Sequence, residues 1–469
     1  MRNDIEWKDY IQEFIKMNEK IEKILEKYRN EMIEKLRQLI MIESETAPAG
    51  YQGSEEAPFG EGPLKAMRYM MDLGAEKGFE VINYDNKACE MNFGEIKEDS
   101  VGIVSHVDVV PASGQWKYPP YGGEIHDGRI YGRGAVDDKG PAIAAFYAAL
   151  AVKESGLKIK KNITQIIGTN EECGDFRCLR HYMNMAKRIP SCGIVPDSFF
   201  PICFSEKHIA NIRITAESTG FSRGNEDKLP LLKTIDGGSA VNVVPASAEA
   251  VFSFGDREDM TVNETGVTAH ASTPELGENA ILKLIIKLSD MDFAPADICS
   301  NVKSLVRLIC NDVDGSGIGI YGKDETGATT SNVGLISYEG GRLAVDINVR
   351  LPLSIDREIL EARLAEKMTG TGMKAEVIYF FKGFYMDPED PVAQTLIQVY
   401  RQESGDTESM PYANGSGSYA RIMDRFVPYG IAKQSEPLQF HVENESISEE
   451  ELFRAARIYA EALYRLACM

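Results

Sequence analysis

The segment from Val101 to Gly140 combines an imidazole with carboxylates at spacings that could hold divalent cations. It begins as a short apolar run and becomes polar at Ser105-His106-Val107-Asp108. Alternate residues of a strand point the same way, so His106 and Asp108 are expected on one face of a strand's carboxyl end. The segment closes with Gly-Arg-Gly-Ala-Val-Asp137-Asp138-Lys-Gly, which adds two acids between glycines. Imidazole with crowded carboxylates is a typical ligand set for a divalent metal.

Further polar groups follow other apolar stretches. Glu171 and Glu172 come just after NITQIIG, Asp197 follows Gly-Ile-Val-Pro, and His441 lies in LQFHVENESIS. Each of these, taken alone, is most simply a helix start, a turn residue or a loop imidazole. Together they predict convergence on one sheet edge, where the acids would repel each other unless cations neutralised them. Because acids outnumber imidazoles, two divalent ions are expected.

The elements that must position these groups alternate between strand and helix. This order predicts an α/β fold, a three-layer α/β/α domain with a mostly parallel sheet whose strand ends carry the ligands. Strands are expected at 81–84, 88–93, 101–104, 162–168 and 193–195, and helices at 5–43, 63–73, 141–156, after 172, at 392–405 and near the C-terminus.

A change of pattern near Lys207 predicts an inserted domain. Strands separated by turns alternate there with two expected helices, at 279–291 and 356–368, which is typical of an α+β lid. The predicted catalytic domain is therefore split into residues 1–206 and 386–469, with a lid formed by residues 207–385.

Length and charge restrict the class of protein. A chain of 469 residues is expected to form at least two domains. Its net charge of −21 disfavours nucleic acid and anionic membranes as partners. The N-terminal segment is charged and has no signal-peptide core, and the eight cysteines form no CxxC pair, so reduced thiols and a cytoplasmic location are expected.

Several motifs resemble one family of enzymes when they are taken in order along the chain. They are SHVDVVP, GRGAVDDKG, GTNEECG, PDSFFP, GVTAHASTPELGENA and FHVENE. They resemble the cocatalytic metallopeptidases that include carnosinase, aminoacylase and succinyl-diaminopimelate desuccinylase. The resemblance runs from about residue 30 to the C-terminus. The long segment 317–353 is similar to the PepV-like bacterial dipeptidases within that family.

The resemblance implies roles for the metal-site candidates. His106, Asp137 and Asp197 would hold one ion, and Asp137, Glu172 and His441 the other, with Asp137 bridging. Glu171 would act as general base toward a metal-bridging hydroxide. Asp108 would hydrogen-bond the far nitrogen of His106 and so fix its tautomer. A cis peptide bond is implied between Asp137 and Asp138.

The same resemblance implies recognition residues outside the metal site. His270 in the AHAS segment would stabilise the negative charge that grows on the scissile carbonyl oxygen. Arg350 would bind the substrate's C-terminal carboxylate, and Asn242 would lie near the reacting carbonyl. Ser416 lies in NGSGSYAR, which is similar to the family's glycine-rich substrate loop.

These expectations together describe a metal-dependent dipeptidase that hydrolyses unblocked dipeptides. Zinc is the expected metal, although ligands rich in Asp and Glu also suit manganese or cobalt. A lid of this length could supply His270 within one chain, so a functional monomer is expected. The alternatives are an N-acyl amino acid deacylase with the same chemistry, and an inactive homologue that binds metal or peptide.

Overall fold

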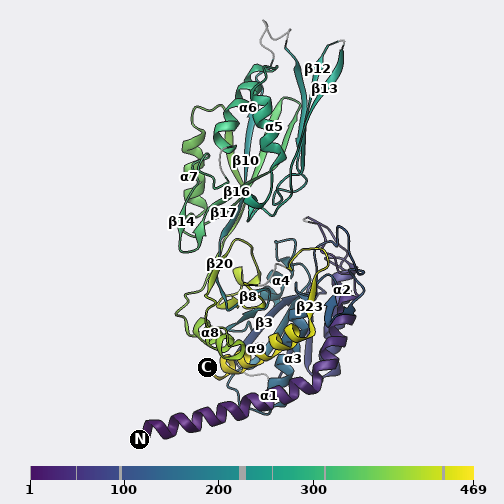
Figure 1. Cartoon of the computed structure of the whole chain (residues 1–469), viewed down its shortest axis with the longest axis vertical. Helices are drawn as coiled ribbons and strands as arrows, with labels where there is room; N and C mark the ends of the chain where they lie inside the picture. The colour runs from purple at the N-terminus through teal and green to yellow at the C-terminus, as the bar shows by residue number, and fades with distance from the viewer. Residues whose placement is uncertain are drawn as a thin grey trace. The chain divides into compact units, whose positions relative to one another are not determined.

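The computed structural model divides the chain into two compact units (Figure 1). It describes residues 2–48, 50–94, 98–220, 229–255, 257–310, 313–435 and 439–469. Unit 1 comprises residues 1–204, 385–412 and 417–469, and unit 2 comprises residues 205–384 and 413–416. Each unit has its own principal sheet, so each is described separately.

The sheet of unit 1 has the strand order β1-β2-β6-β3-β7-β21. Its strands are β1 (Glu80–Tyr84), β2 (Ala88–Asn92), β6 (Asn162–Gly168), β3 (Ser100–His106), β7 (Cys192–Val195) and β21 (Phe426–Pro428). The neighbours β6, β3, β7 and β21 run parallel, whereas β1 and β2 form an antiparallel hairpin that also pairs antiparallel with β6. The predicted α/β class is therefore confirmed, with an antiparallel hairpin added at one edge.

Helices of unit 1 pack against this sheet and against one another. They are α1 (Arg2–Ile40), α2 (Glu61–Glu76), α3 (Lys139–Glu154), α4 (Arg177–Met185), α8 (Pro391–Ser404) and α9 (Glu449–Cys468). Helix α3 contacts α1, α9, β3 and β6. Its sequence is apolar nearly all round, and residues 139–152 are buried, as expected for a helix covered on every side. The turn that precedes α3, which carries Asp137, is therefore anchored to the core.

The final helix starts from a well-defined cap. The hydroxyl of Ser448 accepts a hydrogen bond from the backbone N–H of Glu451, whose carboxylate accepts one from the N–H of Ser448. This reciprocal capping box satisfies two backbone donors at the helix start. It fixes the C-terminal end of the segment that contains His441. Among the helices that the structure describes, none is long and apolar enough to cross a membrane.

Unit 2 contains an antiparallel sheet with the order β13-β12-β11-β16-β17-β10-β18. Its strands are β13 (Arg257–Thr265), β12 (Ser247–Phe254), β11 (Leu231–Gly237), β16 (Thr330–Glu339), β17 (Arg342–Leu351), β10 (His208–Glu217) and β18 (Lys374–Phe381). In the described part of this unit it is accompanied by the α-helices α5 (Ala280–Ser289), α6 (Ala296–Ile309) and α7 (Arg357–Met368). The sheet and these helices share one apolar core.

The sequence-based expectation of two helices in this region was wrong, because it omitted α6. The signal for α6 was present in the chain. Pro295 precedes the helix, and Ile298, Val302, Leu305 and Ile309 recur at helical spacing and are buried. The helix expected at 279–291 ends before this stretch, to which the sequence-based interpretation assigned no element.

Candidate metal centre

The parallel strands of unit 1 bring the predicted ligands to one edge of the sheet. His106 is the last residue of β3 and pairs with Gly168, the last residue of β6. Glu171 and Glu172 follow β6 directly, and Asp197 follows β7. This position, outside the carboxyl ends of parallel strands, is where open α/β sheets collect ligands.

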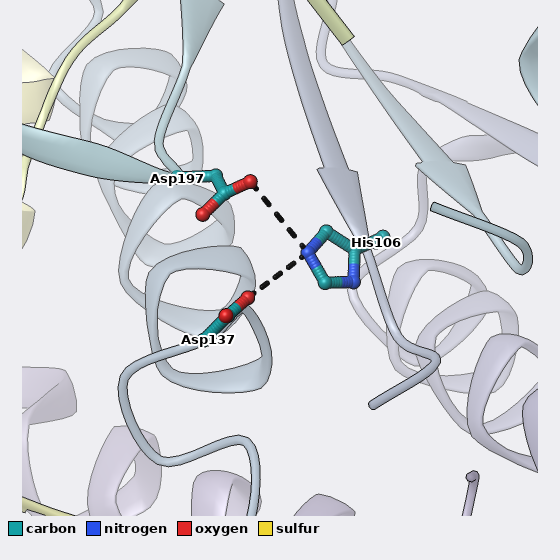
Figure 2. Close-up of side chains that lie close together, drawn as sticks. All are labelled: His106, Asp137 and Asp197. Atoms are coloured by element: carbon teal, nitrogen blue, oxygen red, sulfur yellow. Dashed lines mark ion pairs between the residues drawn. The ribbon is translucent and has the colours of Figure 1, made fainter. Parts of the chain in front are cut away.

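One group of ligand-capable side chains consists of His106, Asp137 and Asp197 (Figure 2). The Nε2 atom of His106 lies 3.2 Å from Oδ1 of Asp137 and 3.8 Å from Oδ2 of Asp197. His106 is buried, and only 14% of the Asp197 side chain is exposed. Ligand atoms of all three residues lie within 4.8 Å of one another, which suits a shared cation.

A second group shares Asp137 with the first and adds Glu172 and His441. The Nε2 atom of His441 lies 2.9 Å from Oδ2 of Asp137 and 3.2 Å from Oε2 of Glu172. Asp137 thus directs one carboxylate oxygen toward each histidine. A carboxylate placed in this way can bridge two cations. The Asp137–Asp138 peptide bond is cis, as the resemblance implied.

Unsatisfied polar atoms indicate that these residues fit metal ions. Nε2 of His106, Oδ1 of Asp137, Oε1 of Glu171 and Oε1 of Glu172 are buried and have no hydrogen-bond partner among the described residues. Buried polar atoms are normally satisfied, so several such atoms in one place call for a ligand. Histidine nitrogen and carboxylate oxygen are the donor types that zinc and related cations bind.

The pKa values of the group reflect crowding of acids. Burial and the neighbouring carboxylate of Asp137 raise the pKa of Glu172 to about 7. Burial disfavours the Asp137 carboxylate, but the contacts with His106 and His441 outweigh it and lower its pKa. The Glu172 and Asp137 carboxylates in turn raise the pKa of His441. Without another cation, the imidazoles must carry the compensating positive charge.

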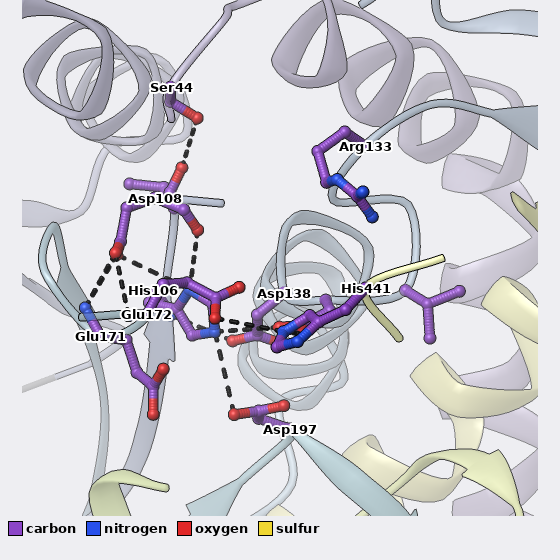
Figure 3. Close-up of polar contacts among 12 residues, drawn as sticks. Ser44, His106, Asp108, Arg133, Asp138, Glu171, Glu172, Asp197 and His441 are labelled. Carbon is purple, nitrogen blue, oxygen red and sulfur yellow. Dashed lines mark hydrogen bonds and ion pairs between the residues drawn. The ribbon is translucent and has the colours of Figure 1, made fainter. Parts of the chain in front are cut away.

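Glu171 lies beside these groups without belonging to either of them (Figure 3). Its residue is 6% exposed, and burial together with the Asp197 and Glu172 carboxylates raises its pKa. A raised pKa makes this carboxylate a stronger base than an exposed glutamate, which is a property that a general base uses. The adjacent acids Glu171 and Glu172 therefore have different environments. Glu172 forms an ion pair with His441, whereas no histidine among the described residues lies within ion-pair distance of Glu171.

The structure corrects the predicted contact of Asp108. Nδ1 of His106 lies 2.9 Å from the backbone carbonyl oxygen of Asp108, whereas its distance to the Asp108 carboxylate is 3.7 Å, too long for a hydrogen bond. The carboxylate instead accepts hydrogen bonds from the N–H of Glu171 at 2.9 and 3.0 Å and of Glu172 at 3.1 Å. These N–H groups lie beyond the end of β6 at Gly168, where no strand pairs with them, and the Asp108 carboxylate satisfies them. Asp108 thus orients the two glutamates, and its carbonyl fixes the imidazole.

The remaining predicted residues lie in unit 2 and form a chain of neighbours. The Asn242 carbonyl oxygen accepts from the N–H of Ala271, next to His270, whose Nδ1 lies 2.6 Å from Oγ of Ser272. Arg350 is 4% exposed and donates from Nη1 to the carbonyl of Gly415 at 2.8 Å. A Cβ at Gly415 would lie 3.2 Å from that of Ser272. Ser416 follows Gly415, so His270, Asn242, Arg350 and Ser416 lie on segments that contact one another.

Sequence reasoning missed two buried residues beside the metal groups. Arg133 and Glu445 form an ion pair of 2.7 Å, and Glu445 also accepts hydrogen bonds from the N–H of Val136 and Asp137. The available signal was an arginine and an acid within motifs already singled out, GRGAVDDKG and FHVENE. Nothing in their local sequence indicated that they pair.

An α/β sheet with two carboxylate-sharing ligand groups at its carboxyl edge defines a dinuclear metallohydrolase class. The chain belongs to peptidase family M20/M25/M40, whose family model matches residues 102–465. Membership agrees with the resemblance carried by the six sequence motifs.

Similar proteins extend over almost the whole chain. The "Putative dipeptidase SH1171" of Staphylococcus haemolyticus is 32% identical over 475 residues, covering 94% of this chain and 98% of the relative. A "Putative dipeptidase" of Staphylococcus epidermidis is 33% identical over 480 residues, covering 95% and 98%. Human carnosine dipeptidase 1 has 15% identity and a TM-score of 0.61, covering 97% of this chain and 99% of that one. The dipeptidase Dug1p of Saccharomyces cerevisiae has 12% identity and a TM-score of 0.60, with 96% and 98% covered. These two structures share the fold.

Proposed function

We propose that the protein is a metal-dependent dipeptidase that hydrolyses unblocked dipeptides. The observation that carries the proposal is the bridging geometry of Asp137, whose two carboxylate oxygens face two different histidines beside the buried Glu171. The names of the staphylococcal relatives support dipeptides as the substrate class. Residues 207–385 are proposed as the lid that recognises the substrate.

The metal ligands are proposed to be His106, Asp137, Glu172, Asp197 and His441. Two divalent cations bound by them would lower the pKa of a water molecule and polarise the scissile carbonyl. Glu171 accepts the proton of that water and passes it to the leaving amine, a task to which its raised pKa is suited.

The proposed substrate contacts come from unit 2. His270 donates a hydrogen bond to the carbonyl oxygen as negative charge develops there. Its Nδ1 accepts a hydrogen bond from the N–H of Ser272 at 3.2 Å, which places the proton of the neutral ring on Nε2. Arg350 binds the C-terminal carboxylate, while Asn242 and Ser416 line the same part of the unit. The contacts of Arg350 with Asn348 and Gly415 hold its guanidinium in place.

A comparison of substrates tests this function. Purified protein should hydrolyse free dipeptides, lose activity in a chelator and regain it when a divalent metal is added back. N-acetyl and N-succinyl amino acids serve as parallel substrates. Turnover of only the acylated substrates would establish a deacylase instead, and turnover of neither class, with metal bound, would establish an inactive homologue.

Zinc is the proposed metal, because it binds both imidazole nitrogen and carboxylate oxygen, and the proposed ligands are two imidazoles and three carboxylates. Zinc also prefers tetrahedral coordination, which needs fewer ligands per ion than octahedral coordination does. Elemental analysis of protein purified without chelators should find about two zinc ions per chain. Manganese or cobalt at the same stoichiometry, with activity restored only by that metal, would replace zinc in the proposal.

One chain is proposed to contain the whole catalytic apparatus, in the cytoplasm of its cell. Light scattering should give the mass of a monomer at assay concentration. Mixing the Glu171→Gln and His270→Ala proteins should restore no activity, since each chain would lack one essential group. Restored activity would mean that His270 acts on a partner's metal centre. Cell fractionation tests the location.

A further inference from the structure

The loop that carries His441 is joined to the turn that carries Asp137 by one buried carboxylate. Glu445 lies four residues after His441, and its side chain is 1% exposed. Its Oε1 accepts hydrogen bonds from the N–H of Val136 at 2.8 Å and of Asp137 at 3.2 Å. The backbone of the proposed bridging ligand is therefore held by a residue of the His441 loop.

Arg133 completes this connection from the opposite side. Its Nη1 donates to Oε2 of Glu445 at 2.7 Å and to the carbonyl oxygen of Val442 at 3.2 Å. Val442 directly follows His441, so Arg133 contacts the loop next to His441 as well as at Glu445. Figure 3 shows Arg133 next to the loop that carries His441. The N–H of Gly132 adds a backbone hydrogen bond to the Glu445 carbonyl at 3.0 Å.

Burial makes these contacts interdependent. A buried carboxylate needs several donors, and Glu445 has three, namely Arg133 and the N–H groups of Val136 and Asp137. Removing the Glu445 charge would leave the buried Arg133 uncompensated, since no other acidic partner of Arg133 is recorded among the described ion pairs. The loop would then lose its fixed distance from the Asp137 turn.

The two proposed ion sites depend on this connection to different degrees. His106 and Asp197 are placed by β3 and β7, which pair directly in the sheet. His441 instead lies in an irregular loop with φ of +59° and is half-exposed at 50%. Asp137 is common to both sites, but only the second site takes a ligand, His441, from the loop itself.

We propose that Glu445, paired with Arg133, is a positioning residue that sets the separation of Asp137 and His441 and thereby the affinity of the second ion site. This inference rests on the proposed dinuclear function. Outer partners of metal ligands typically change metal affinity by about 10- to 100-fold when they are removed. The effect should be larger at the His441 site, because the His106 site shares only Asp137 with it and takes His106 and Asp197 from the ends of paired strands.

Metal titration of single-site proteins tests the proposal without using turnover. Glu445→Gln is introduced into the His106→Ala protein, which keeps the His441 site, and into the His441→Ala protein, which keeps the His106 site. Zinc affinity is measured for each by competition with a chromophoric chelator. We expect about a 10- to 100-fold loss in the first background and less than about threefold in the second.

Matched controls separate positioning from general stability. Glu461→Gln removes another buried acid that pairs with an arginine, Arg465, and should change neither affinity. Arg133→Lys keeps the positive charge but cannot span both acceptors, so it should weaken the His441 site in the same selective way. It also provides the test if Glu445→Gln fails to fold.

Equal losses at both sites, or no loss at either, would overturn the proposal. A lower melting temperature with unchanged zinc affinities would likewise assign Glu445 a purely structural role. A chain that binds both ions with the predicted selectivity yet cleaves no dipeptide would refute the proposed function and leave this inference standing.

Discussion

The polar groups of unit 1 and those of unit 2 are assembled in different ways. In unit 1, acids and imidazoles from strand ends and loops are crowded together, and several of their buried atoms lack hydrogen-bond partners among the described residues. In unit 2, His270, Asn242, Arg350 and the segment with Ser416 adjoin one another through hydrogen bonds and backbone contacts. The first arrangement requires cations, whereas the second presents hydrogen-bond donors on a β framework. Variants in unit 1 should therefore affect metal binding or proton transfer, and those in unit 2 should affect substrate binding or stabilisation of the transition state without loss of metal.

The largest expected effect distinguishes the role of Glu171 from that of its neighbour Glu172 in unit 1. Glu171→Gln should lower kcat by about 100- to 10,000-fold, the usual contribution of a general base, with two ions still bound. Glu172→Gln is the matched neighbour and should lose one ion, because Glu172 contacts His441. Steady-state kinetics and metal analysis of both proteins provide the measurement. Metal loss from Glu171→Gln would assign it to the ligand set.

The second effect tests whether unit 2 contributes to chemistry. His270→Ala should lower kcat by about 100- to 1,000-fold, the loss typical of one oxyanion donor, with unchanged metal content. His126→Ala is the control, because that imidazole pairs with Glu124 in unit 1, outside both metal groups. A change in KM alone would show that His270 binds the substrate without stabilising the transition state.

A smaller effect distinguishes recognition from catalysis within unit 2. Arg350→Lys should lower kcat/KM for a dipeptide by about 10- to 100-fold, because a bidentate charged contact is lost. The corresponding dipeptide amide has no carboxylate and should be affected little. Equal losses for both substrates would mean that Arg350 supports the fold of unit 2 and does not read the carboxylate.

The smallest effect tests the corrected role of Asp108. Asp108→Asn should leave the zinc affinity of the His106 site within about threefold, because the backbone carbonyl is the partner of His106, whereas an outer carboxylate partner would typically matter 10-fold or more. The loss of carboxylate contacts to Glu171 and Glu172 should cost about 1–3 kcal/mol of unfolding free energy. Chemical denaturation and zinc competition measure the two quantities. A large loss of zinc affinity would mean that the Asp108 carboxylate, and not its carbonyl, is the partner of His106 as first predicted.

Local patterns predicted the elements that carry the site but not all their contacts. The alternation of apolar strands and helices indicated β3, β6, β7 and α3, because core strands and buried helices must be apolar. Helix α6 was missed although its apolar residues recur at helical spacing from Ile298 to Ile309. The hairpin of β1 and β2 was expected as strands, but its antiparallel direction depends on pairing with β6, which no local pattern records.

The sequence by itself determined that His106, Asp137, Glu172, Asp197 and His441 were candidates for one ligand set, because strand ends and motif resemblance are visible along the chain. Only the tertiary structure decided which atoms meet. The Asp108 carboxylate accepts a hydrogen bond from the backbone N–H of Glu171, because that buried N–H has no strand partner. Glu445 contacts Val136 across 309 residues of sequence. Side-chain direction and long-range proximity depend on packing of the whole unit, and a linear pattern of residue types does not encode them directly.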